Sequence, residues 1–590
     1  MIKSTKTRKI TKQHIILILL SVIILLPNIL ACFLANNLGT VWNRLFYLLC
    51  SLIVFLIPAL IFRARTFLVL NTVTICLGLF EMVHLITNKA TTSLLFVYTI
   101  LISEPGEALE LISSGWPVIL LYLLLLTGYF FLIFKVINND YLFQKKTRII
   151  LAATFSALFL GSFGIWEWLD KKEIYLPEMP IHNESVHLNF VEDIEKVFPL
   201  DVLLACHRII VLNHAINTQK DNVSKFSFGI QPSPNDSNQQ TIIVLVIGET
   251  ARYGNFGING YHRNTTPKLA QRKNLISFTH TYSIANLTTV SVPFILSRAT
   301  PQTINVLPKE KSVVDAFAEA GYETCWFANQ SFGNKLLMSI SNACTHTAYL
   351  PVDVKNHSNL DMNLLQYLIP IEQDNQQKKF IVLHTLGCHF KYNCRYPSDF
   401  AQFKPDMNGD IKLQQMLKEQ NIHSFNDIIK LNTSSPLFNE VRELLVNSYD
   451  NAILYTDAFL DSTITILESA HQPAVLLYLG DHGENLLDDE RNMLLHATYH
   501  GSIYEYHIPM MIWVSDEYKQ KYAQKYINLQ SNKDKNISSM TVFHSLLDLG
   551  NIQYETFDST LSIASTALHS DSILWGLDAN MKLMQIPTQR

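Results

Sequence analysis

The sequence lacks several patterns that would point to common classes of protein. It has no Cys-x-x-Cys pair among its 8 cysteines, which argues against a zinc-thiolate site. Basic residues are not in excess: the net charge is −4 at pH 7, so no global positive field indicates nucleic-acid binding. Internal repeats and long low-complexity tracts are also missing. What remains is a folded chain whose 590 residues are too many for one compact domain.

Apolar residues are unevenly distributed along the chain. The mean hydropathy of +0.15 is high for a sequence with 16% charged residues, and nearly all of the excess precedes residue 170. A helix needs about 20 apolar residues to cross a bilayer core of about 30 Å. Five runs approach that length: Ile15–Ala35, Leu45–Phe62, Phe67–Ile86, Val118–Phe134 and Ile149–Leu169. We therefore expect a five-helix transmembrane domain over residues 1–170, with no cleaved signal peptide because no small-residue cleavage site follows the first run.

Basic residues in the short loops predict the orientation of these spans. They gather before the first run, between the second and third, and between the fourth and fifth: Lys3, Lys6, Arg8, Lys9, Lys12, Arg63, Arg65, Lys135, Lys145, Lys146 and Arg148. The alternate loops hold little beyond Arg44 and Lys89. The N-terminus is therefore expected in the cytoplasm, and five crossings place the chain after residue 170 outside it.

Three regions beside the spans mix polar with apolar residues. Residues 91–115, which include Glu107, mix polar and apolar side chains and are expected to lie in the membrane interface. Glu81 and His84, at the outer end of the third run, are interpreted as interfacial residues reaching water, with contact to a lipid headgroup as the alternative. Residues 171–240 are expected to form a bridging helix and a polar linker.

The remainder, residues 241–590, alternates short apolar runs with longer helical patterns. The runs begin at Thr241, Glu323, Phe380, Ala474 and Met510. Continuous apolar runs of this length, bounded by turn residues, are typical of strands buried on both faces of a mostly parallel sheet. With a helix expected over Leu437–Ala470, the pattern predicts an α/β/α sandwich.

Metal-ligating side chains follow three of these runs. Glu249 follows the first, His384 and His389 lie at the end of the third, and Asp481 and His482 follow the fourth. Ligands bind beyond the carboxyl ends of the strands in open α/β sheets. Together with His496, this set of nitrogen and oxygen ligands suits zinc, with manganese less suited, and is large enough for a second ion.

A nucleophile is available among the small residues of 285–293. Thr288, Thr289 and Ser291 are hydroxyls in this stretch. A threonine hydroxyl near a metal ion is an activated nucleophile, because coordination lowers its pKa. Without a metal nearby, the stretch is an ordinary loop opening a helix.

Five segments together resemble the phosphoethanolamine transferases of the alkaline-phosphatase-like superfamily. They are GETARYGNFGINGYHRNTTPKL (residues 248–269), NLTTVSVPF (286–294), HTLGCHF (384–390), YDNAILYTD (449–457) and GDHGENLLDDERNMLLHATYHG (480–501). The resemblance covers the whole chain, membrane domain included. It implies a zinc-dependent enzyme of the bacterial inner membrane, with a periplasmic catalytic domain. Such an enzyme transfers phosphoethanolamine from phosphatidylethanolamine to lipid A, lipopolysaccharide core or a similar glycan, through a phospho-threonine intermediate. We expect a monomer that does not bind nucleic acid.

The resemblance also implies roles for individual residues. Thr288 matches the nucleophile and, with Glu249, Asp481 and His482, the ligands of one zinc ion. A second zinc ion or the substrate phosphate is matched by His384, His389, His496, Asn329 and Lys335. His500 competes with His496 for the last histidine position, and the distance to Ile508 favours His496.

The sequence departs from the family pattern in two places. Lipid A enzymes flank the nucleophile with cysteines, whereas Ile284 and Phe294 stand here. The usual Gly-Glu-Asn-Gly stretch after the Asp-His-Gly-Glu motif is replaced from Asn485 onward. The chain therefore resembles a divergent branch, and its acceptor stays open.

The cysteines outside the predicted spans face an oxidising compartment, where disulfides persist. Proximity in sequence predicts the pairs Cys388–Cys394 and Cys325–Cys344 and leaves Cys206 over.

Three other functions compete with phosphoethanolamine transfer. A sulfatase needs a Cys or Ser in a C/S-x-P-x-R setting, and Arg298 falls too late after Pro293. A glycerol-phosphate polymer synthase shares the five spans and the threonine but resembles this chain less around residues 248–252 and 384–389. A non-enzymatic envelope-binding protein is disfavoured because every expected catalytic position is filled.

Overall fold

The computed structural model describes residues 12–35, 38, 41–88, 90–93, 96–97, 100, 120, 122–154, 196–210, 225–230, 240–307, 309–330, 335–350, 360–369, 378–408, 436–488, 491–498, 501–578, 581 and 583–588. The chain divides into two compact units, Met1–Val211 and Leu212–Arg590. The predicted boundaries at residues 170 and 240 stay predictions.

The first unit contains three helical stretches long and apolar enough to cross a membrane: Ile15–Leu34, Asn43–Ile61 and Ala64–Ile86. They belong to α1 (Lys12–Leu34), α2 (Val41–Ile61), α3 (Ala64–Leu70) and α4 (Thr72–Asn88). They coincide with the first three predicted runs. A shorter apolar helix, Tyr122–Lys135, overlaps the fourth. Most of the fifth run, like most of the interfacial segment 91–115 with Glu107, lies outside the described residues, so the count of five is not confirmed.

Polar side chains are buried inside this unit. Glu81 and His84 are 1% and 2% exposed, so the interpretation that they reach water is wrong. The Thr92 hydroxyl donates to the Glu81 carboxylate. The Tyr47 hydroxyl donates to the Asn28 amide oxygen at 2.7 Å, which joins α1 to α2. Buried polar groups need such partners because water cannot reach them.

The second unit is built on a seven-stranded sheet with strand order β2-β10-β7-β1-β6-β4-β5. Its strands include all five predicted runs, which confirms the α/β fold: β1 (Ile242–Gly248), β2 (Leu275–Phe278), β4 (Glu323–Ala328), β5 (His346–Tyr349), β6 (Lys379–His384), β7 (Ala474–Gly480) and β10 (Met510–Val514). β7, β1, β6, β4 and β5 pair in parallel. β10 runs antiparallel to β7 and β2.

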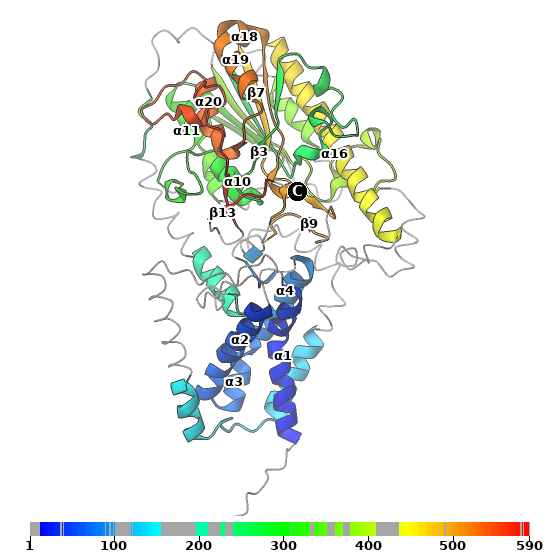
Figure 1. Cartoon of the computed structure of the whole chain (residues 1–590), viewed down its shortest axis with the longest axis vertical. Helices are drawn as coiled ribbons and strands as arrows, with labels where there is room; N and C mark the ends of the chain where they lie inside the picture. The colour runs from blue at the N-terminus through cyan, green and yellow to red at the C-terminus, as the bar shows by residue number, and fades with distance from the viewer. Residues whose placement is uncertain are drawn as a thin grey trace, which may run out of the picture. The chain divides into compact units, whose positions relative to one another are not determined.

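Helices cover both faces of this sheet (Figure 1). The side chains of β1 alternate: Ile243 and Leu245 pack into one apolar cluster, and Ile242 and Val244 into the other. α16 (Pro436–Ser469), predicted over Leu437–Ala470, packs against the second cluster. The first cluster is covered by α10 (Thr288–Ile295), α11 (Val313–Glu319), α18 (Asp516–Lys521), α19 (Ala523–Asn532) and α20 (Val542–Leu549). The result is the three-layer sandwich expected for a strand buried on both faces.

Smaller elements surround the carboxyl ends of the parallel strands. They are β3 (Thr281–Tyr282) paired with β11 (Ile537–Ser538), β8 (Asn485–Leu486) with β9 (Leu494–Leu495), β12 (Trp575–Leu577) with β13 (Leu583–Gln585), and the helices α12 (Lys335–Ser341) and α17 (Ile503–Tyr506).

All eight cysteines are free thiols, so the two predicted disulfides are wrong. Cys325 belongs to the apolar cluster on one face of the sheet, whereas Cys344 packs against the cluster on the other face. Cys388 is buried in the core beside α16, and Cys394 is half-buried. Closeness in sequence therefore does not bring these thiols together.

Candidate active site

The register of the sheet places the predicted ligands Glu249 and Asp481 side by side at the carboxyl ends of β1 and β7. Gly248, the last residue of β1, pairs with Gly480, the last residue of β7. Glu249 and Asp481 therefore leave adjacent parallel strands side by side, and His482 follows directly. The Asp481 N–H donates to the Gly248 carbonyl at 2.9 Å, which extends the pairing into the site.

α10 presents Thr288 to this pair of strand ends. The helix begins at Thr288, and the N–H groups of Val290 and Ser291 both donate to the Leu287 carbonyl, at 3.0 and 2.9 Å. The hydroxyls of Ser283 and Ser291 both donate to the Asp481 carbonyl, at 2.5 and 2.6 Å. These bonds hold the start of α10 against the end of β7.

Four side chains converge at this point. The Thr288 hydroxyl lies 3.0 and 3.1 Å from the two Glu249 carboxylate oxygens and 3.1 Å from His482 Nε2. His482 Nε2 lies 3.5 Å from Asp481 Oδ2. Among the described residues, Glu249, Asp481 and His482 form a cluster in which one ligand atom of each lies within 4.8 Å of the others. All three are buried.

The hydrogen bonds of this cluster leave its inner atoms available to a cation. Asp481 Oδ1 accepts from the N–H groups of Thr250 and His482, whereas Asp481 Oδ2 is buried without a hydrogen-bond partner. His482 Nδ1 lies 2.8 Å from the Gly483 carbonyl, so Nδ1 carries the proton and the Nε2 lone pair faces Thr288. Buried carboxylates are normally paired or bound to a metal. The residues therefore fit a divalent cation.

Burial and neighbouring charge affect the ionisation of these groups. Burial, followed by the Asp481 carboxylate, raises the pKa of Glu249 well above its usual value. Burial lowers the pKa of His482. A buried Glu249 carboxylate therefore stays ionised more readily when a positive charge lies beside it.

A second group of residues lies beside the first. The His496 ring is centred 4.3 Å from that of His482 and 6.3 Å from that of His389. His496 Nδ1 lies 3.2 Å from Glu484 Oε2, and burial raises the pKa of Glu484 to about 8. Burial, followed by the Arg395 charge, lowers the pKa of His389 to about 3, so its imidazole is neutral at physiological pH.

Gly387 allows the loop that carries His389 to approach Glu249. Its φ is +47°, and a Cβ there would lie 2.8 Å from the backbone N and O of Glu249. The Cys388 N–H donates to the Glu249 carbonyl at 3.0 Å. A side chain at residue 387 would strain the turn. It would also push the segment after β6 away from the end of β1.

Other predicted residues are less directly placed. His384 ends β6 and is buried, with its ring 5.9 Å from that of Trp326. The Asn329 amide donates to Asp361 at 2.8 Å. The Lys335 side chain and His500 lie outside what the structure describes. The phosphate or second-metal roles of these residues stay predictions.

Two site residues were missing from the prediction. Gln330 follows Asn329 and donates to Glu249 Oε2 at 2.7 Å. Glu484 lies two residues after His482 and contacts His496. Both residues lie one or two positions from a predicted site residue, which was the signal available in the sequence. The sequence alone does not show which side chains after a strand end point into the site.

Comparison with known sequences identifies the family. Residues 241–552 match the family model described as Sulfatase. The chain is 30% identical over 319 residues to the Kdo(2)-lipid A phosphoethanolamine 7''-transferase of Salmonella typhimurium, covering 51% of this chain and 49% of that protein. It is 27% identical over 345 residues to phosphoethanolamine transferase EptC of Escherichia coli, covering 56% and 54%. The chain thus spans about half the length of these relatives.

Solved structures show the same fold. The integral membrane protein lipooligosaccharide phosphoethanolamine transferase A from Neisseria meningitidis matches with a TM-score of 0.61 at 23% identity, over 88% of this chain and 89% of that one. The C-terminal periplasmic domain of Escherichia coli EptC, in complex with Zn, matches with a TM-score of 0.52 at 24% identity, over 60% and 96%. The chain belongs to the sulfatase family, and its resemblance to the phosphoethanolamine transferases is confirmed.

Proposed function

We propose that this protein transfers phosphoethanolamine from phosphatidylethanolamine to an envelope glycolipid or glycan, with Thr288 as the covalent carrier at a zinc site. The observation that carries the proposal is the position of the Thr288 hydroxyl, within 3.1 Å of both Glu249 and His482 at the start of a helix. The relatives named above are phosphoethanolamine transferases, one of them named for Kdo(2)-lipid A.

Zinc suits the donor atoms of the cluster. Glu249, Asp481, His482 and Thr288 supply oxygen and one imidazole nitrogen, the ligand types and number of a zinc site. The related EptC domain has been solved in complex with Zn. When bound, zinc would lower the pKa of the Thr288 hydroxyl and offset negative charge at the phosphoryl group. One firm site is proposed, and His389 and His496 leave room for a second.

The other steps of the proposed transfer are assigned to residues around Thr288. Thr288 Oγ1 forms the bond to phosphorus, and the bond from phosphorus to the diacylglycerol oxygen breaks. Because α10 begins at Thr288, the positive end of its helix dipole would stabilise negative charge at that position. His389 Nδ1 lies 2.7 Å from the Phe390 carbonyl and His496 Nδ1 lies 3.2 Å from Glu484 Oε2, so the Nε2 lone pair of each neutral imidazole is suited to bind a second zinc ion.

The proposed location is the bacterial inner membrane, with the N-terminus in the cytoplasm and the catalytic unit in the periplasm. Three apolar helical stretches long enough to span support a membrane location. Arg63 and Arg65, between α2 and the body of α3, lie on the side predicted to be cytoplasmic. The donor and the acceptor of the proposed reaction are both envelope components.

Mass spectrometry of envelope lipids and glycans tests the function. Cells with the protein should contain a glycolipid or glycan that carries an added phosphoethanolamine, and cells without it should not. Cells expressing Thr288→Ala should match the cells without the protein. Identical envelopes in the three strains, under conditions where the protein is made and inserted, would contradict the proposal.

A further inference from the structure

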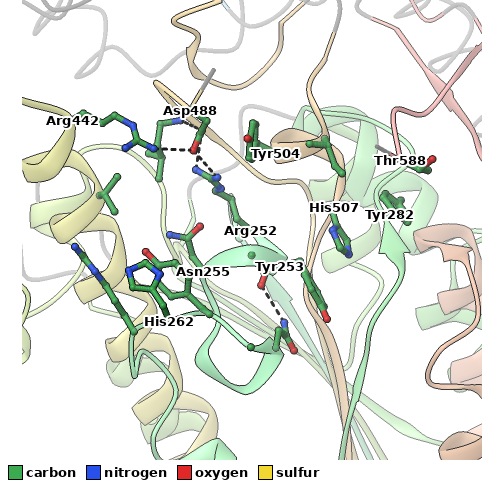
Figure 2. A pocket seen from close by; sticks show the side chains of 18 of the residues that line it. Arg252, Tyr253, Asn255, His262, Tyr282, Arg442, Asp488, Tyr504, His507 and Thr588 are labelled. Atoms are coloured by element: carbon green, nitrogen blue, oxygen red, sulfur yellow. Dashed lines mark hydrogen bonds and ion pairs between the residues drawn. The ribbon is translucent and has the colours of Figure 1, made fainter. Parts of the chain in front are cut away.

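A large cavity lined by polar and aromatic side chains lies in the catalytic unit (Figure 2). Its volume is about 940 Å³, within the ~300–1,000 Å³ range of small-molecule sites. Its walls combine planar polar side chains with aromatic rings: Arg252, Tyr253, Arg442, Asp488, Tyr504 and His507. None of these residues belongs to the metal cluster, so the cavity needs an explanation of its own.

Two short segments connect the cavity to the site. Arg252 lies three residues after Glu249, a separation that a chain spans in at most about 11 Å. Asp488 lies six residues after His482. Between them, Gly483 packs closely: a Cβ there would lie 2.0 Å from the Tyr504 carbonyl oxygen and 3.4 Å from Arg252 Cγ. Gly483, the residue after His482, therefore lies against two residues of this wall of the cavity.

The floor of the cavity is fixed by paired charges. The Arg252 guanidinium donates to both oxygens of Asp488, at 3.1 and 2.9 Å, and lies 4.7 Å above the Tyr504 ring. Arg442 reaches the same carboxylate at 3.7 Å, and its side chain is 41% exposed. The Arg252 guanidinium and the Asp488 carboxylate therefore have fixed positions before a ligand binds.

The charge of the cavity excludes a strongly anionic ligand. Arg252 and Arg442 face Asp488, Arg263 is bound by Asp450 at 2.9 Å, and the exposed Glu443 lies on the wall. Positive and negative side chains are therefore balanced. Balanced arrays of donors and acceptors suit hydroxyl groups, which both donate and accept hydrogen bonds.

Flat aromatic surfaces complete the wall. The Tyr253 ring stacks on His507 at 4.1 Å with 12° between the planes, and His507 stacks on Tyr282 at 4.7 Å. Tyr253 and His507 are half-buried, so the stack supports a rigid aromatic surface in the cavity. A sugar ring has hydroxyl groups at its edge and apolar C–H groups on its faces. A tyrosine ring can pack against the apolar face, and its hydroxyl can bond to the sugar hydroxyls.

We propose that this cavity binds a saccharide unit of the acceptor and presents its neighbouring hydroxyl to the active site. The inference rests on the proposed transferase function and adds the place in the catalytic unit where the acceptor's sugar binds. Arg442 and Asp488 bind sugar hydroxyls, and Tyr253 packs against a ring face.

Binding to the full-length protein in detergent micelles tests this inference. The probe is a neutral oligosaccharide from a lipopolysaccharide core, freed of phosphate and acidic sugars and titrated by calorimetry. The wild type should bind it, and Arg442→Gln and Tyr253→Ala should each raise its Kd at least about tenfold. Arg272→Gln is the matched control, because Arg272 also pairs with carboxylates of α16, Asp461 and Glu468, but lies outside the cavity. It should bind as the wild type does.

The failures of the two proposals are distinguishable. The inference is overturned if the wild type does not bind the oligosaccharide, or if both cavity variants bind it with wild-type affinity. It is also overturned if the cavity variants lose affinity for glycerophosphoethanolamine, a mimic of the donor headgroup, rather than for the oligosaccharide. Phosphoethanolamine on Thr288 of the wild type, after incubation with the donor alone, would leave the proposed function intact in each of these cases.

Discussion

The two oxygens of the Asp481 carboxylate have different surroundings. Oδ1 accepts two backbone N–H bonds, which fix the orientation of the side chain. Oδ2 is buried without a partner and lies 3.5 Å from His482 Nε2. An unpaired buried carboxylate oxygen is costly, and the proposed cation would offset that cost at Oδ2.

Replacing Asp481 with Asn tests this interpretation. The amide keeps the size of the side chain but offers a neutral ligand, so zinc affinity should fall at least about tenfold and transferase activity should fall with it. Bound zinc per protein, measured by inductively coupled plasma mass spectrometry, checks the prediction. Asp516→Asn, at the start of α18, is the control and should retain zinc. Full activity of the wild type after exhaustive chelation would contradict the metal site altogether.

At the scale of elements, α16 connects its face of the sheet to the segment after β1. Asp450 binds Asn255, Tyr261 and Arg263, and Asp461 binds Arg272. Asp457 accepts the N–H groups of Lys268 and Leu269 at 3.0 and 2.9 Å. One long helix therefore fixes the loop that runs from Glu249 past the cavity.

Asp457 should make the stability of the catalytic unit depend on pH. Burial raises its pKa from 3.8 to about 6, so the folded state binds more protons than the unfolded state between these values. Stability must then fall as pH rises from about 4 to about 6, by roughly 3 kcal/mol at ~1.4 kcal/mol per pKa unit.

Asp457→Asn cannot titrate and should lack this contribution. Relative to the variant, the wild type should lose stability between pH 4 and 6 and change little above pH 7. Urea denaturation of the full-length protein in detergent, followed by tryptophan fluorescence, measures the difference. A difference that stays constant from pH 4 to 7 would contradict the assignment.

Elements were more predictable from the sequence than contacts between side chains. Runs such as Ile242–Gly248 are apolar on both faces, and the ligands Glu249 and Asp481 directly follow strands that pair in register. The failures are contacts that depend on packing. Cys325 and Cys344 pack on opposite faces of the sheet, and Glu81 is buried with the Thr92 hydroxyl as a partner.

For the whole molecule, the proposed reaction requires the catalytic unit to lie outside the cytoplasm. Fusions of a periplasmic reporter enzyme after residue 170 should be active, because basic residues predict a cytoplasmic N-terminus. Fusions at Arg65, between α2 and the body of α3, should be inactive with that reporter. A cytoplasmic reporter that is active after residue 170 would contradict both the orientation and the access of the enzyme to its acceptor.

The covalent carrier is the central claim. Purified full-length protein, incubated with phosphatidylethanolamine and no acceptor, should acquire one phosphoethanolamine, and peptide mass spectrometry should place it on Thr288. Thr288→Ala should carry none and lose activity by at least about a thousandfold. Thr289→Ala, the adjacent control, should still be modified at Thr288. Phosphoethanolamine on Thr289, or a Thr288→Ala protein that still transfers the group, would contradict the account.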